Sequence, residues 1–297
     1  SSVDGNYCVR YSTRGECDPI IPVMHRKMQS NAYTLAEEFV SNFGYQGLDP
    51  SVYNVIQCIS NSSLTTQPLK TEDFYRFEFG RDLHKLYLNP QPRYSEDIDL
   101  VQINAEPFGP LVDRIRERLA FLGEPTRKQK ENNFTLHYRF ESEFPPIQKL
   151  RLKVETNCRE HFAVLGYQKF PFQVNSSWFK GSCNITTYPL EELLGTKLRA
   201  LYQRRKGRDL YDLFKALVQV PDLDKKALLQ CYHAYMDFGV AEPPTQKGFL
   251  QNLEAKIRDD EFTGDIAALL RPTEKYDQEI AFEYVRRELL DQMEVSK

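Results

Sequence analysis

Alternating apolar and polar residues predict a series of strands in the first two thirds of the chain. Over residues 134–140 every second side chain is apolar and the ones between are polar, and residues 150–156 alternate in the same way. Successive side chains of a strand point to opposite faces, so both segments fit half-buried strands. Residues 97–101, where two aspartates alternate with apolar residues, and the aromatic segment 74–79 are predicted as further strands.

Helical periods take over in the last third of the chain. From Leu190 onward strand patterns vanish, and apolar residues recur at helical spacing, with breaks near the prolines at 221, 243, 244 and 272. An earlier helix is predicted between 111 and 122, where four apolar residues lie three or four positions apart. Shorter helical patterns occupy residues 33–43, 52–59 and 83–87.

These elements define the expected domain organisation. The chain is predicted to be α+β in its first two thirds and all-α in its last. We expect an irregular N-terminal arm over residues 1–32, an α/β domain over 33–187 and a helical domain over 188–297.

Composition narrows the class of protein. Of the 297 residues, 41% are hydrophobic and 27% are charged, which is ordinary for a globular protein, and no apolar run reaches the length of a membrane span. With no signal peptide visible and six cysteines without C-x-x-C spacing, we expect a cytoplasmic protein with reduced thiols and no zinc site. The net charge of −3 leaves no global basic field, so any nucleic-acid partner must be held by a local patch.

Two aspartates in the strand at 97–101 are candidate metal ligands. Asp97 and Asp99 are two residues apart, so they share one strand face and offer the hard oxygen donors that Mg²⁺ prefers. Glu155 becomes a third acid if its strand pairs beside theirs, and such a cluster can clamp the oxygens of a phosphoryl displacement. The alternatives to a metal site are that Asp97 and Asp99 form a solvated acidic pair and that Glu155 lies on an ordinary polar strand face.

A basic run follows at residues 197–208. It holds six cations in an otherwise acidic protein, and leucines at helical spacing give it an apolar stripe. A solvated helix is the usual interpretation of such a charge run. Cations presented from a packed element also suit phosphate chains or a nucleic-acid backbone.

Four motifs together resemble a known family. In chain order they are Ser95–Leu100, Leu152–Asn157, Glu192–Leu201 and Gly207–Leu213. They resemble the AbiEii-type nucleotidyltransferases, which are toxins of toxin–antitoxin and phage-abortive systems and relatives of DNA polymerase β. The resemblance covers about residues 74–215 and implies a polymerase-β-like nucleotidyltransferase mixed sheet with flanking helices, followed by an all-α C-terminal domain. It also implies Mg²⁺-dependent transfer of a nucleotidyl group from an NTP, with a tRNA 3′ end as a possible acceptor and an antitoxin protein as a possible partner.

Carried onto this sequence, the resemblance gives the acids their roles. Asp97 and Asp99 would hold Mg²⁺, and Glu155 would be the third metal ligand and would activate the acceptor hydroxyl. Asp209 would complete the catalytic group from the helical side.

The same resemblance assigns the substrate-binding residues. Lys197 would contact the triphosphate, with Arg208 or Asp212 beside Asp209, and Ser95 would contact the substrate next to the acids. The chain departs from the family at the phosphate-binding turn, where relatives carry two glycines and a hydroxyl residue. Here the turn reads Phe79-Gly80-Arg81, so that beside Gly80 a phenylalanine replaces one glycine and an arginine replaces the hydroxyl residue. A side chain where the backbone must approach phosphate is costly, and Arg81 would either grip phosphate in place of the lost contacts or block the pocket.

Two other functions stay open at this point. A degenerate family member could keep the fold and act as a protein-binding module without transfer, which the altered turn favours. A metal-dependent nuclease is the third possibility, because Asp99, Lys153 and Glu155 loosely resemble an acid-acid-lysine nuclease site, although the order of lysine and acid is reversed.

Overall fold

The computed structural model describes residues 77–79, 86–88, 92–93, 97–130, 133–141, 147, 149–175, 180–267, 269–270 and 274–293. The predicted arm, the helical patterns at 33–43 and 52–59, and most of the one at 83–87 lie outside these residues. The chain separates into two units. The sheet unit comprises residues 1–82, 95–162 and 167–187, and the helical unit comprises residues 83–94, 163–166 and 188–297.

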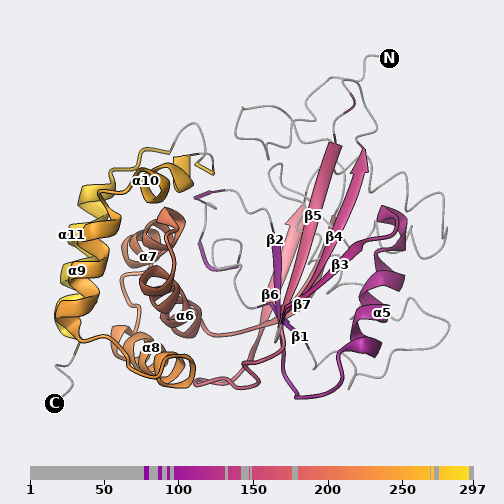
Figure 1. The fold of residues 1–297 in the computed structure, drawn as a ribbon, viewed down its shortest axis with the longest axis horizontal. Coiled ribbons are helices and arrows are strands. Elements are labelled where there is room, and N and C mark those ends of the chain that lie inside the picture. Colours follow the sequence, from indigo (N-terminus) through magenta and orange to yellow (C-terminus); the bar gives the residue numbers. More distant parts are fainter. Residues whose placement is uncertain are drawn as a thin grey trace. The chain divides into compact units, whose positions relative to one another are not determined.

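The sheet unit is built on five strands in the order β1-β2-β5-β4-β3 (Figure 1). Their bounds are β1 Phe77–Phe79, β2 Asp97–Gln102, β3 Thr126–Lys130, β4 Asn133–Glu141 and β5 Lys149–Asn157. β2 and β5 are parallel and the other neighbours are antiparallel, so the sheet is mixed. The expected pairing of the aspartate strand with the strand at 150–156 is confirmed.

One face of this sheet is buried and the other is not. In β4 the apolar residues Phe134, Leu136 and Tyr138 are at most 2% exposed, whereas the residues between them are partly or fully exposed. The helix α5, Gly109–Arg118, contributes buried leucine, valine and isoleucine side chains to the same core. The ring of Phe108, at the start of α5, contacts the ring of Phe134 with centroids 5.7 Å apart, which places the start of the helix against the buried face.

Three strands, β3, β6 and β7, were not predicted from the sequence. β3 is exposed at all five positions, so it has no apolar alternation by which it could be recognised. The hairpin of β6, Gln168–Asn175, and β7, Lys180–Thr187, forms a separate two-stranded sheet. Its strands carry a proline, a glycine and several polar residues, which weaken a strand signal.

The helical unit confirms the predicted helical last third. Its helices are α6 Leu190–Gln203, α7 Gly207–Gln219, α8 Lys225–Gly239, α9 Gln246–Lys256, α10 Asp260–Ala267 and α11 Gln278–Glu288, followed by the 3₁₀ turn η3, Leu290–Gln292. Side chains of Asp224, Thr245 and Asp277 accept hydrogen bonds from the first free backbone N–H groups of α8, α9 and α11. None of the helices described is both long and apolar enough to cross a bilayer.

A buried glutamate ties a short connection into the helical unit. Glu192 on α6 is fully buried and accepts hydrogen bonds from the backbone N–H groups of Val164 and Leu165 at 2.7 and 2.8 Å. Its carboxylate also accepts from the hydroxyl of Tyr235 at 2.8 Å. These three donors compensate the burial of the carboxylate, and they explain why residues 163–166 belong with the helices rather than with the sheet.

Candidate active site

The three predicted metal-binding acids lie on one face of the sheet. β2 and β5 run in register, so Asp97 lies beside Lys153 and Asp99 lies beside Glu155. Ile98, between the two aspartates, is 2% exposed on the other face. Alternation along each strand therefore puts Asp97, Asp99 and Glu155 on the accessible face, and all three are half-buried.

A lysine lies between two of these acids. Nζ of Lys153 is 2.7 Å from Oδ2 of Asp97 and 3.1 Å from Oε2 of Glu155. Burial lowers the pKa of Lys153, but the hydrogen bond and charge of Asp97, followed by those of Glu155, outweigh it and raise the pKa above its ordinary value. The lysine is therefore charged at neutral pH. The amide of Asn133 also donates to Oε1 of Glu155, at 3.3 Å.

The donor chemistry of this face fits Mg²⁺, because carboxylate oxygens are the ligands that this ion prefers. In the part of the chain that the structure describes, however, no three His, Cys, Asp or Glu side chains gather closely enough to hold a metal ion. Binding of Mg²⁺ by Asp97 and Glu155 requires their oxygens to exchange the ammonium of Lys153 for the metal. The metal-binding role of these acids stays a prediction.

The helical unit brings together three of the predicted residues. Nζ of Lys197 on α6 lies 3.3 Å from Oδ1 of Asp209 and 3.0 Å from Oδ2 of Asp212. The two aspartates are three residues apart on α7, so they share one helix face, and both are fully buried. The side chain of Lys197 is only 8% exposed.

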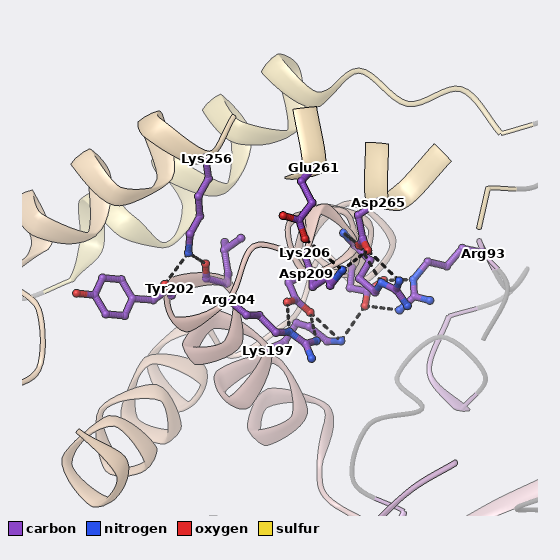
Figure 2. A network of polar contacts seen from close by, with 12 residues as sticks. Arg93, Lys197, Tyr202, Arg204, Lys206, Asp209, Lys256, Glu261 and Asp265 are labelled. Carbon is purple, nitrogen blue, oxygen red and sulfur yellow. Dashed lines mark hydrogen bonds and ion pairs between the residues drawn. The ribbon is translucent and has the colours of Figure 1, made fainter. Parts of the chain in front are cut away.

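Two arginines extend these contacts into what we term the buried ion-pair chain, Arg204–Asp209–Lys197–Asp212–Arg93, in which only the terminal Arg204 is exposed, at 41%. Arg204 holds both carboxylate oxygens of Asp209 at 2.6 and 2.7 Å, and Arg93 holds those of Asp212 at the same two distances. Figure 2 shows the side chains of Arg204 and Lys197 directed toward Asp209. Three cations alternate with two carboxylates, so each carboxylate has a bidentate arginine and a lysine.

Sequence reasoning missed Arg93. It lies in a short segment without periodicity, and its only sequence signal is its place four residues before Asp97. Its partner Asp212 lies 119 residues further along the chain, so only the fold reveals the pair.

Arg208 is directed to a different partner. Its guanidinium donates to Oδ2 and Oδ1 of Asp265 at 2.8 and 2.9 Å, and its backbone N–H donates to the same carboxylate at 3.3 Å. The structure therefore places Arg208 against α10, whereas Lys197, Asp209 and Asp212 contact one another.

The basic run at 197–208 is not one helix, because α6 ends at Gln203 and α7 begins at Gly207. A Cβ atom at Gly207 would lie 2.2 Å from the carbonyl oxygen of Phe262, so this corner packs closely against α10. The cations of the run contact acceptors of the helical unit itself. In addition to the contacts of Lys197, Arg204 and Arg208, Arg199 donates to the carbonyl oxygen of Tyr235. Arg205 pairs with Asp259, and Lys206 pairs with Asp265. In this arrangement the protein's own acceptors engage these cations, and their binding of phosphate stays a prediction.

The remaining predicted residues, Gly80, Arg81 and Ser95, lie outside the described residues. The strand that precedes the first two is described: β1 ends at Phe79, which pairs with Leu100 of β2. The predicted phosphate-binding turn thus starts where β1 ends.

With this geometry established, comparisons with known proteins identify the class. The solved structure of MenT4, a nucleotidyltransferase toxin of Mycobacterium tuberculosis H37Rv, matches with a TM-score of 0.56 at 15% identity, covering 92% of this chain and 90% of that chain. JHP933 of Helicobacter pylori also matches, with a TM-score of 0.43 at 16% identity over 73% of this chain and 86% of that chain. No curated protein matches the sequence. The fold is that of the nucleotidyltransferases, as the sequence motifs implied.

The family follows from the sequence itself. The family described as "Nucleotidyl transferase AbiEii toxin, Type IV TA system" matches residues 83–286, which is more than half of the chain. The chain belongs to this family of nucleotidyltransferase toxins, and the resemblance seen in the four motifs is confirmed.

Proposed function

We propose that the chain transfers a nucleotidyl group from an NTP to an acceptor hydroxyl in a Mg²⁺-dependent reaction, as the toxin of a toxin–antitoxin or phage-defence pair. Family membership supports transfer and the toxin role. The observation that carries the chemistry is the register of β2 and β5, which puts Asp97, Asp99 and Glu155 on one accessible face.

The acids have distinct tasks in the proposed reaction. Asp97, Asp99 and Glu155 hold Mg²⁺, which supplies positive charge to the phosphates. Glu155 takes the proton of the acceptor hydroxyl as its oxygen attacks the α-phosphate. A new P–O bond forms at that phosphorus, and the bond to the pyrophosphate leaving group breaks. Such a reaction depends on alignment and charge stabilisation more than on covalent chemistry by the protein.

Substrate binding is assigned to cations and to the turn after β1. Lys197 contacts the triphosphate, and Asp209 and Asp212 hold its ammonium in place in the absence of nucleotide. Gly80, Arg81 and Ser95 are proposed to contact the phosphates near the sheet, and Arg208 to support the helical side. A tRNA 3′ end is the proposed acceptor, and an antitoxin protein is the proposed partner.

One observation favours a second function. Both lysines that would meet substrate or metal are engaged by carboxylates, Lys153 by Asp97 and Glu155 and Lys197 by Asp209 and Asp212. In a non-catalytic family member these ion pairs would be purely structural, and the protein would act as a protein-binding module.

A single incubation separates the possibilities. The full chain is mixed with total RNA, Mg²⁺ and each of the four NTPs in turn, labelled at the α-phosphate. Transfer predicts label in RNA for at least one NTP, and chelation of Mg²⁺ should abolish it. A non-catalytic binding module leaves the RNA unlabelled and intact, and a nuclease shortens it.

A further inference from the structure

The acid-bearing face of the sheet continues into a group of cations. Arg151 of β5 pairs with Arg139 of β4. Glu155 of β5 pairs with Thr135 of β4, which in turn pairs with Lys128 of β3. Two residues further along β3, Lys130 is paired with β4 on the same face. Residues paired across strands share a face, so these cations lie on the same side as Asp97, Asp99 and Glu155. We call Lys128, Lys130, Arg139 and Arg151 the sheet-face cations.

These cations differ from Lys197, Arg204 and Arg208 of the basic run in having no carboxylate partner. All four are exposed, and among the residues that the structure describes none of them makes an ion pair. In contrast, Lys197, Arg204 and Arg208 are each held by aspartates. The sheet-face cations are therefore available to an anionic partner, whereas those three cations of the basic run are engaged within the protein.

The arrangement on the sheet is also unfavourable for the protein alone. Arg139 and Arg151 are directly opposite each other in an antiparallel pair, where like charges destabilise. The positive charge of this face also affects His137. Burial lowers the pKa of His137, and the charges of Lys128, Lys153 and Arg139 lower it further. The charge of Asp97 has a smaller, opposing effect on this pKa. An anion bound over this face would relieve the repulsion.

Protection of a sheet edge accounts for only part of this pattern. β3 is an edge strand, and lysines on an edge discourage pairing with other chains. Arg139 and Arg151, however, lie on β4 and β5 and face each other across that pairing. The repulsion between these two arginines is therefore not explained by protection of β3.

We propose that the sheet-face cations bind the sugar–phosphate backbone of a nucleic-acid strand, and, resting on the proposed function, that this strand carries the acceptor hydroxyl. The positions from Arg151 to Lys130 extend about 20 Å along the strands and about 10 Å across them, which suits several successive phosphates. Arginine forks match phosphate oxygens, and the group lies on the face that carries Asp99 and Glu155. It is the local patch that a protein of net charge −3 needs to hold a polyanion.

The test measures binding separately from transfer. Anisotropy of a labelled single-stranded RNA is followed at increasing NaCl for the full chain and for two double variants, Arg139→Gln with Arg151→Gln, and Lys128→Gln with Lys130→Gln. Each pair should weaken binding and lower the slope of log affinity against log salt by about 1.4, because each lost phosphate contact contributes about 0.7. The matched control, Lys247→Gln with Arg258→Gln, removes two exposed cations of the helical unit and should leave the slope unchanged.

Further measurements separate phosphate contact from misfolding and from general attraction to polyanions. Glutamine keeps the edge strand polar, and the single variant Arg151→Gln, expected to lower the slope by about 0.7, covers the case in which a double variant fails to fold. DNA of the same sequence and heparin are compared with the RNA. Binding of heparin without binding of either nucleic acid, or equal losses in the control variant, would overturn the proposal.

Failure of the proposed binding surface can be distinguished from failure of the proposed transfer function. Asp99→Asn should bind the RNA at least as tightly as the parent while losing transfer. If the parent transfers label and both sheet variants keep its KM for RNA, the proposal fails and the function stands. If the parent binds RNA with the predicted slopes but transfers nothing, the function fails and the surface stands.

Discussion

At the scale of single residues, the buried ion-pair chain has a structural role that any assay must take into account. Asp212 is fully buried between Lys197 and Arg93, and the side chain of Arg93 is 6% exposed. Removing one partner of a buried pair leaves the other charge uncompensated in a low-dielectric environment. A loss of activity in an Asp212 variant therefore needs a measurement of stability beside it.

Asp212→Ala should lower the free energy of unfolding by about 3–5 kcal/mol, because the guanidinium of Arg93 would stay buried without its carboxylate. Urea denaturation of the two proteins measures the difference. The control is Asp113→Ala, whose side chain is 73% exposed in a weak pair with Arg116, and whose effect should stay within about 0.5 kcal/mol. An Asp212 variant as stable as this control would show that the buried ion-pair chain does not contribute to the stability of the fold.

Lys256 is another buried cation, and it acts at the end of a helix. Its Nζ donates to the carbonyl oxygens of Leu201 and Tyr202 at 2.6 and 2.5 Å, two carbonyls of the last turn of α6 that lack helical partners (Figure 2). Burial lowers the pKa of Lys256 to about 8, with an opposing effect of Asp209 and a further lowering by Arg205.

This depressed pKa predicts a pH dependence of stability. Between about pH 8 and the ordinary lysine value of 10.5, the unfolded chain binds a proton at Lys256 that the folded chain has released. Stability therefore rises with pH across this window, and the contribution is absent below it. Lys256→Met should lack this rise, so the difference in unfolding free energy between parent and variant should grow from pH 8 to pH 10.5. A constant difference would contradict the assignment.

The residues of the site were partly predictable from the sequence. Strand alternation and pairing were enough to bring Asp99 and Glu155 together, because a two-residue period fixes the face once the register is known. The lysine between Asp97 and Glu155, and the clamp by Arg93 on Asp212, depend on side-chain contacts that no local pattern encodes.

At the scale of elements, close packing of helices constrains individual glycines. A Cβ atom at Gly195 of α6 would lie 2.7 Å from Cβ of Cys231 and 2.9 Å from the backbone of α8 at Leu228 and Tyr232. These are distances that side chains do not tolerate without a shift of one helix. The contact of α6 with α8 thus depends on the absence of a side chain at this position.

Gly195→Ala should therefore destabilise the protein by about 1–3 kcal/mol, the usual cost of overpacking. Gly264→Ala is the matched change, because Gly264 lies in α10 with nothing within 4 Å of an added Cβ. There, alanine should be neutral or stabilise by up to about 1 kcal/mol through its helix propensity. Thermal or urea unfolding compares the two variants, and equal effects would refute the packing argument.

Sequence patterns predicted the half-buried elements better than the exposed ones. β4 and β5 alternate between buried and exposed positions and were recognised, and α5 was recognised from its helical period. β3 has no buried position, so only its pairing with β4 makes it a strand. The break between α6 and α7 was hidden because Gly207 and the cations around it are also compatible with a continuous helix.

At the scale of the whole molecule, the proposed reaction assigns work to both units. The sheet unit carries the acids and the sheet-face cations, and the helical unit carries Lys197, Asp209 and Asp212. The family match spans residues 83–286 and so includes parts of both units. The function therefore belongs to the full chain, and every experiment above uses it.

The most direct test of metal-dependent transfer is the rate at which Asp99→Asn moves α-labelled nucleotide to RNA in Mg²⁺. Asp99 is half-exposed, so the variant should keep the parental free energy of unfolding within about 0.5 kcal/mol. Loss of a metal ligand should lower the rate about 100-fold or more, since metal ions contribute several kcal/mol to such reactions. The control Asp222→Asn, at an exposed turn, should transfer at the parental rate. A folded Asp99→Asn protein that transfers label as fast as the parent would contradict the proposed role of the strand acids.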